Sequence, residues 1–410
     1  MAILPEATRF IQLPKMINVR QLFPNEKVED VYLESLKQLE MKKVETLFEA
    51  GDSAAILVGS RGISGLKEVV KATVDYLKSF GVEPFIVPSM GSHGGGIAEE
   101  QQAIVERLGV TEEYIGVPIK ASMDTVTIGS TIDGVKIHID EIASKADHII
   151  PIARVKQHTD FDGPIESGLC KMLAIGLGNH KGCSTLHKEG FINFHKVIPE
   201  VAEVVIEKNN IPFGMAIVEN AHENVHTILP VYGKDILKEE PGILELSKSL
   251  MPRLYFDHID VLIIEKIGKD ITGAGMDPNI TGRTSLGRSP YFNGPTITRI
   301  VAIGLSEGTH GNANGVGYAD FITRELYEEI DFVSTYTNGI AAGSPSACNI
   351  PVFLDTEEEA ILAALQTCPR VDPSKAKVVR IKDTLHLVDI KVSESLLEQC
   401  QDRSKFEMKL

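Results

Sequence analysis

The sequence lacks tryptophan altogether and contains only five cysteines in 410 residues. The cysteines form no CxxC pair and their number is odd, which argues against a disulfide framework and against a structural zinc site. The sequence therefore predicts a protein of a reducing compartment.

Positive charge and long apolar runs are also scarce. The chain has 41 Lys and Arg against 57 Asp and Glu, a net charge of −16, so it is a poor candidate for binding nucleic acid or an anionic membrane. No window approaches the roughly 18 uninterrupted apolar residues of a membrane span, and the N-terminus has no signal-peptide pattern. We therefore expect a cytoplasmic protein that binds neither nucleic acid nor membrane.

Strand-like runs alternate with helix-like runs along the chain. Residues 53–61 form an apolar run that ends in a glycine-flanked turn, residues 65–81 follow with helical spacing, and Asp133-Gly134 predicts a hairpin turn. Such alternation indicates an α/β fold with largely parallel sheets. We predict two α/β domains, residues 1–255 and 256–410, with the boundary where a helix is followed by a new strand.

Polar residues follow three predicted strands of the first half, where ligands gather in α/β sheets. Arg61 lies between glycines at a strand–helix junction, which fits either an anion site or an exposed turn arginine. His93 precedes three glycines, and His158 stands near two aspartates. Each histidine fits a ligand-facing role or a structural one.

Lys171 is unusual because it stands inside an apolar run, "ESGLCKMLAIGLG" (166–178). On a helix it shares a face with Ala174, Ile175 and Gly178. Such a lysine should either extend to water or have a special partner.

The ordered set "GSHGGG" (91–96), "RVKQHTDF" (154–161) and "ESGLCK…GLGNHKG…LHKEG" (166–190) resembles the lactate racemase family. These proteins are nickel-pincer-nucleotide-dependent 2-hydroxyacid racemases and epimerases. "GKDITGAGMDPNITGR" (268–283) resembles the second-domain loop of a divergent branch. The resemblance implies two α/β domains with the cofactor in the cleft between them.

The resemblance also implies roles for individual residues. Lys171 matches the lysine that bonds covalently to the cofactor, and His187, with His180 as the alternative, matches the protein ligand to nickel. His93 and His158 match the general acid and base. The remaining expected contacts are to the cofactor (Arg61 at its phosphate, Ser60, Gly91, Gly94) and to the substrate carboxylate (Lys269, with Lys266 behind it).

The implied reaction inverts C2 of a small 2-hydroxy acid by reversible hydride transfer. A bound cofactor must hold the hydride, because no side chain is a good hydride acceptor. Two other classes stay open: a metal-dependent hydrolase using some of His93, His158 and His187 around zinc, and a non-catalytic nucleotide- or metabolite-binding protein. We expect cofactor-biosynthesis enzymes as suppliers of the cofactor, and the oligomeric state is open, a homo-oligomer included.

Overall fold

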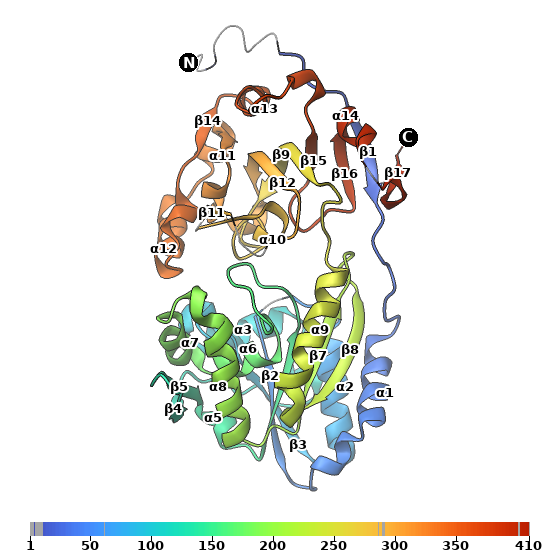
Figure 1. The fold of residues 1–410 in the computed structure, drawn as a ribbon. Helices are drawn as coiled ribbons and strands as arrows, with labels where there is room; N and C mark the ends of the chain where they lie inside the picture. The colour runs from blue at the N-terminus through green and yellow to red at the C-terminus, as the bar shows by residue number, and fades with distance from the viewer. Residues whose placement is uncertain are drawn as a thin grey trace. The chain divides into compact units, whose positions relative to one another are not determined.

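The computed structural model describes residues 4, 11–60, 62–285, 287–288, 292–400 and 402–409. The chain forms two compact units (Figure 1). One spans residues 25–251, and the other combines the described residues of 1–24 with residues 252–410. Both are layered α/β units, which confirms the predicted fold class.

A five-stranded sheet lies at the centre of the 25–251 unit. The order across the sheet is β3 (Glu83–Pro88), β2 (Ser53–Val58), β6 (His148–Arg154), β7 (Phe213–Glu219) and β8 (Val225–Tyr232). The first four strands in this order are parallel, and β8 is antiparallel to β7.

Helices cover both faces of this sheet because alternate residues of its buried strands point to opposite sides. Ala55 and Leu57 of β2 belong to the core that contains residues of α8 (Phe194–Lys208) and α9 (Ile236–Leu250). Ile56 and Val58 belong to the core with α1 (Val31–Lys42) and α2 (Leu66–Ser79). Figure 1 shows α8 and α9 in front of the sheet and α2 behind it.

The predicted hairpin is confirmed. Strands β4 (Thr125–Ser130) and β5 (Lys136–Asp140) pair antiparallel. Between them Gly134 has φ +85°, a conformation that favours glycine. The other α-helices of four residues or more among the described residues of this unit are α3 (Ala98–Arg107), α4 (Glu112–Ile115), α5 (Glu141–Ser144) and α7 (Asn179–His187).

The second unit contains an eight-stranded mixed sheet. Its parallel part is β14 (Val352–Leu354), β13 (Phe321–Thr323), β12 (Thr296–Leu305), β9 (His258–Ile267) and β15 (Val378–Ile381). The antiparallel part is β16 (Asp389–Ser393), β1 (Met16–Gln21) and β17 (Phe406–Met408). The helices are α10 (Pro278–Thr281), α11 (Arg324–Glu328), α12 (Phe332–Ala341), α13 (Glu357–Gln366) and α14 (Glu394–Glu398), and β10 (Arg283–Thr284) pairs with β11 (Gly287–Arg288).

The structure differs from the predicted division at the start of the first domain. Strand β1 pairs with β16 from Met16↔Ser393 to Arg20↔Asp389, and the Arg20 guanidinium donates to both Asp389 oxygens at 2.8 and 2.9 Å. The segment therefore belongs to the second unit. Local sequence patterns place residues 1–24 in the first domain. They miss the pairing with β16, because a contact between segments nearly 400 residues apart leaves no pattern in either segment.

No helix in the described part of the chain is long and apolar enough to cross a membrane.

Candidate active site

Three adjacent strands present the expected polar residues at one edge of the five-stranded sheet. Ser60 follows β2, His93 follows β3, and His158 follows β6. Strands β3 and β6 flank β2, so they lie roughly 10 Å apart, two strand spacings. The two histidine-bearing loops therefore leave the sheet on either side of β2. Arg61 lies outside the described residues.

His158 lies on a loop whose two ends are joined. Lys156 and Ser167 exchange backbone hydrogen bonds of 2.9 and 3.1 Å. Inside the loop the buried Glu166 accepts from the His158 backbone N–H at 2.5 Å. The Lys248 Nζ of α9 lies 2.9 Å from Glu166. The loop is thus fixed from within and from α9.

Lys171 lies at the end of α6 (Leu169–Lys171), which continues into a π-helical segment over Met172–Gly176. The Leu177 N–H reaches back five residues to the Met172 carbonyl at 2.9 Å. The wider turn alters the helix face predicted for Lys171, Ala174 and Gly178, and such π segments are frequent at functional sites.

Three phenylalanines form an aromatic cluster that contacts several of the candidate site residues. Phe161, Phe191 and Phe194 pack with ring centroids 5.1–5.5 Å apart where they are paired. The His158 ring stacks 4.4 Å from Phe161, and the Lys171 Nζ lies 5.9 Å from the same ring. The structure therefore places His158 and Lys171 on one phenylalanine.

His187, at the end of α7, also packs against this aromatic cluster. Its ring packs edge-on against Phe191 and Phe194, with centroids 5.5 and 5.3 Å away. Loss of water around the ring lowers the pKa of His187, and the positive charge of Lys171 lowers it further. At neutral pH the imidazole is therefore predominantly neutral, the form that binds metals.

His93 lies in a turn built from glycines. Gly94, Gly95 and Gly96 have φ of 61°, 66° and 69°, a run that other residues rarely adopt. The buried Gln101 amide holds the turn by donating to the carbonyls of Gly91 and His93 at 2.9 and 3.0 Å. The His93 side chain is exposed at this edge.

Gly91, Gly94 and His180 pack around this turn rather than in the aromatic cluster. A Cβ on Gly91 would lie 3.0 Å from the Cys183 Sγ, and one on Gly94 would lie 3.1 Å from Glu100 Cβ. His180 is exposed, and its ring would lie 2.8 Å from a Cβ on Gly96. Of the two histidines considered as nickel ligands, His187 is the one beside Lys171.

Cys170, next to Lys171, is fully buried. Burial raises the pKa of its thiol well above the ordinary value, and the neighbouring Glu240 carboxyl raises it further. The thiol is therefore an inert part of the core.

Lys266 and Lys269 lie in the second unit, at the carboxyl end of β9. Lys266 pairs with Gly304 of β12 and is exposed. The Lys269 backbone N–H donates to Thr309 Oγ1 at 3.0 Å, which fixes the loop after β9. This is the strand edge where α/β units bind ligands.

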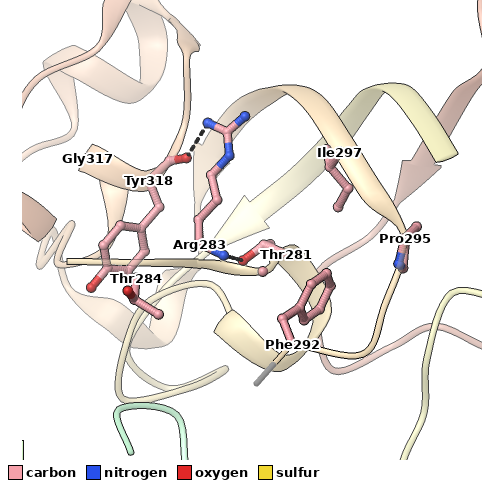
Figure 2. A pocket seen from close by; sticks show the side chains of 9 residues that line it. Thr281, Arg283, Thr284, Phe292, Pro295, Ile297, Gly317 and Tyr318 are labelled. Carbon is pink, nitrogen blue, oxygen red and sulfur yellow. Dashed lines mark hydrogen bonds between the residues drawn. The ribbon is translucent and has the colours of Figure 1, made fainter. Parts of the chain in front are cut away.

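The second unit also contains a cavity of about 300 Å³, lined by Thr281, Thr284, Phe292 and Tyr318 (Figure 2). Arg283 lines it too, but its guanidinium donates to the carbonyls of Tyr318 and Thr298 at 3.0 and 3.1 Å and pairs with Asp320 at 2.7 Å. These contacts occupy the Arg283 guanidinium, so the cavity is not a simple anion site.

Sequence patterns missed the residues that organise the site. Phe161, Phe191 and Phe194 are far apart along the chain or belong to different elements, so only the fold brings them together. Glu166 and Glu240 are fully buried carboxylates that look like ordinary surface residues in the sequence. A usable signal was present for the pair Phe191 and Phe194, whose spacing of three suits one helix face.

Comparison with known proteins identifies the family. Residues 11–224 match the family described as lactate racemase N-terminal domain. Since the match covers more than half of the chain, the protein belongs to the lactate racemase family.

Two solved structures share the fold over most of the chain. One is a structural-genomics protein from Thermotoga maritima, at 15% identity and a TM-score of 0.54, covering 89% of this chain and 99% of that one. The other is the lactate racemase apoprotein from Thermoanaerobacterium thermosaccharolyticum, at 14% identity and a TM-score of 0.55, covering 91% and 99%. A search of curated proteins finds no match. The family match supports an isomerase of the racemase type.

Proposed function

We propose that the protein is a racemase or epimerase that inverts C2 of a small 2-hydroxy acid, using a nickel-pincer nucleotide. The observation that carries the proposal is the aromatic cluster of Phe161, Phe191 and Phe194, which gathers His158, Lys171 and His187 beside the carboxyl edge of the sheet. Family membership and the likeness to a lactate racemase apoprotein support the class of reaction.

The side chains that pack beside the aromatic cluster have the chemistry to hold the cofactor. Lys171 offers an amine for the covalent link, and the neutral imidazole of His187 suits a nickel ligand; His180 is the alternative. Arg61 would hold the cofactor phosphate, with Ser60 and the turn of Gly91 and Gly94 alongside. When bound, the cofactor supplies a centre that accepts a hydride and returns it.

His93 and His158 act as acid and base in this proposal. One imidazole takes the proton of the C2 hydroxyl as the hydrogen on C2 leaves with its electron pair, which yields a 2-keto acid. Reversal from the other face of the carbonyl returns the hydride to C2 and the proton to oxygen. Two bases are useful because the two enantiomers present their hydroxyls differently. Lys269, or Lys266 behind it, would bind the carboxylate.

The hydrolase alternative would need a cluster of metal ligands supplied by the protein itself. Among the described residues there is no group of three or more His, Cys, Asp or Glu side chains placed to hold a metal ion. Such a hydrolase would take at least three metal ligands from the protein, whereas a pincer cofactor contributes donors of its own.

Racemisation in D2O tests the reaction. Protein made together with the cofactor-building enzymes should interconvert the enantiomers of 2-hydroxy acids while C2 keeps its original hydrogen, as measured by chiral chromatography and mass spectrometry. Incorporation of solvent deuterium at C2 during each turnover would contradict hydride transfer. Binding without turnover across a broad panel would favour a non-catalytic protein.

Substitution of the two bases tests their assignment. His93→Asn and His158→Asn should each lower kcat by roughly 10²- to 10⁴-fold and leave the bound cofactor in place. A variant that keeps full turnover would remove its histidine from the mechanism.

A further inference from the structure

Helix α9 directs two ionisable side chains at the segment that carries the chemistry. Glu240 and Lys248 are eight residues apart, about two helical turns, so they lie along the same side of the helix. Glu240 is fully buried and Lys248 is 23% exposed. Neither has a role in the reaction described above.

Glu240 lies at the start of α6. Its Oε2 accepts from the Cys170 backbone N–H at 2.9 Å, and the carboxyl also takes a hydrogen bond from the backbone of Leu169. The carboxylate thus satisfies amides that the first turn of a helix leaves unpaired.

The backbone at Gly168 is shaped around this carboxylate. A Cβ on Gly168 would lie 2.1 Å from Glu240 Oε1, so no other residue fits there without movement. Within the described residues Oε1 itself has no hydrogen-bond partner. A buried carboxyl group with one oxygen unpaired is costly, so Glu240 contributes to the position of α6 at the expense of stability.

Lys248 contacts the loop of His158 through Glu166. Its Nζ lies 2.9 Å from Glu166 Oε1, and Glu166 Oε2 accepts from the His158 N–H at 2.5 Å. The Nζ is also 3.8 Å from Asp162 and 3.4 Å from Glu245. The ion pair with the buried Glu166 is the one that leads to His158.

We propose that α9 is the positioning helix of this site: Glu240 positions Lys171, and Lys248 positions His158 through Glu166. The need for such a helix follows from the local structure. Helix α6 has three residues and runs into a π segment, and a helix this short has little stability of its own. The proposal rests on the proposed function for the roles of Lys171 and His158.

Chemical footprinting of the full-length chain without cofactor tests the proposal. Acetic anhydride labels Lys171 and diethyl pyrocarbonate labels His158, and peptide mass spectrometry gives both rates in each variant. Glu240→Met, which removes both acceptor oxygens, should change Lys171 labelling about fivefold or more, the scale of a lost helix cap, with His158 within about twofold. Lys248→Met should give the reverse pattern, and Lys248→Arg should restore it.

Two substitutions on the same helix serve as controls. Glu239→Gln and Lys238→Met alter side chains that α9 presents to the surface and should leave both rates unchanged. If Glu240→Met does not fold, as judged by circular dichroism, Glu240→Asp takes its place. Equal changes at both sites in both variants, or no change in folded variants, would overturn the proposal. These rates need no cofactor, so a failure to bind nickel or to racemise would refute the proposed function and leave this result standing.

Discussion

At the scale of single residues, the site depends on carboxyl groups buried beneath it. Burial raises the pKa of Glu240 to about 7, against which its hydrogen bonds to Cys170 and Leu169 act only partly. Burial raises the pKa of Glu166 as well, opposed by its bonds to His158 and Lys248. Glu240 therefore makes the stability of the 25–251 unit depend on pH up to about neutrality.

The pH dependence of stability in Glu240→Gln follows from this. From about pH 4.5 to about 7 the folded protein keeps a proton on Glu240 that the unfolded chain has lost, so wild-type stability falls as pH rises through that window. At about 1.4 kcal/mol per pH unit, the wild type should lose at most about 3.5 kcal/mol relative to Glu240→Gln. Urea unfolding of both proteins at several pH values measures this difference. A constant difference across the window would contradict it.

The assignment of the nickel ligand gives a second prediction at this scale. His187→Ala should lower the nickel retained after dialysis by about tenfold or more, because it removes the neutral imidazole beside Lys171. His180→Ala should retain the metal, since that ring packs against the turn at Gly96. Elemental analysis of both variants decides, and the opposite pattern would make His180 the ligand.

At the scale of elements, residues 169–187 form a helical ribbon that packs against the ends of the strands. The apolar run around Lys171 was correctly predicted as helical and buried. The π segment was not predicted, and neither was its close packing: a Cβ on Gly176 would lie 2.7 Å from the Ser89 carbonyl oxygen. The glycine allows the ribbon to approach the end of β3 closely.

Two glycine-to-alanine substitutions test this packing. Gly176→Ala should destabilise the protein by about 1 to 3 kcal/mol, since the new methyl meets the Ser89 backbone and Met172 Sδ. Gly242→Ala, in the exposed part of α9 with no atom within 4 Å of the new Cβ, should stabilise it by about 0.5 to 1 kcal/mol. Thermal unfolding measures both. Equal effects of the two substitutions would show that the close approach does not matter.

At the scale of the whole molecule, the sequence predicted what local periodicity and strand ends encode. The α/β class, the hairpin at Asp133-Gly134 and the placement of His93 and His158 after strands all follow from such patterns. The aromatic cluster, the buried Glu240 and the pairing of β1 with β16 do not, because each joins residues that are distant along the chain. Long-range contacts are set by the packed fold rather than by any one segment.

Removal of residues 1–24 tests the assignment of β1. Because β1 lies between β16 and β17 in the sheet, its loss should expose backbone groups on both neighbours. Hydrogen exchange should then accelerate in β16 and β17 and stay unchanged in β2 and β6 of the 25–251 unit. Faster exchange confined to the 25–251 unit would contradict the assignment.

The central claim is that Lys171 and His187 hold a nickel-pincer nucleotide. The most direct measurement is the intact mass and nickel content of the full chain made together with the cofactor-building enzymes. We expect one nucleotide adduct and one nickel per chain, with the adduct on the Lys171 peptide and absent from Lys171→Ala. An unmodified mass without nickel, in protein made beside a family member that does become loaded, would contradict it.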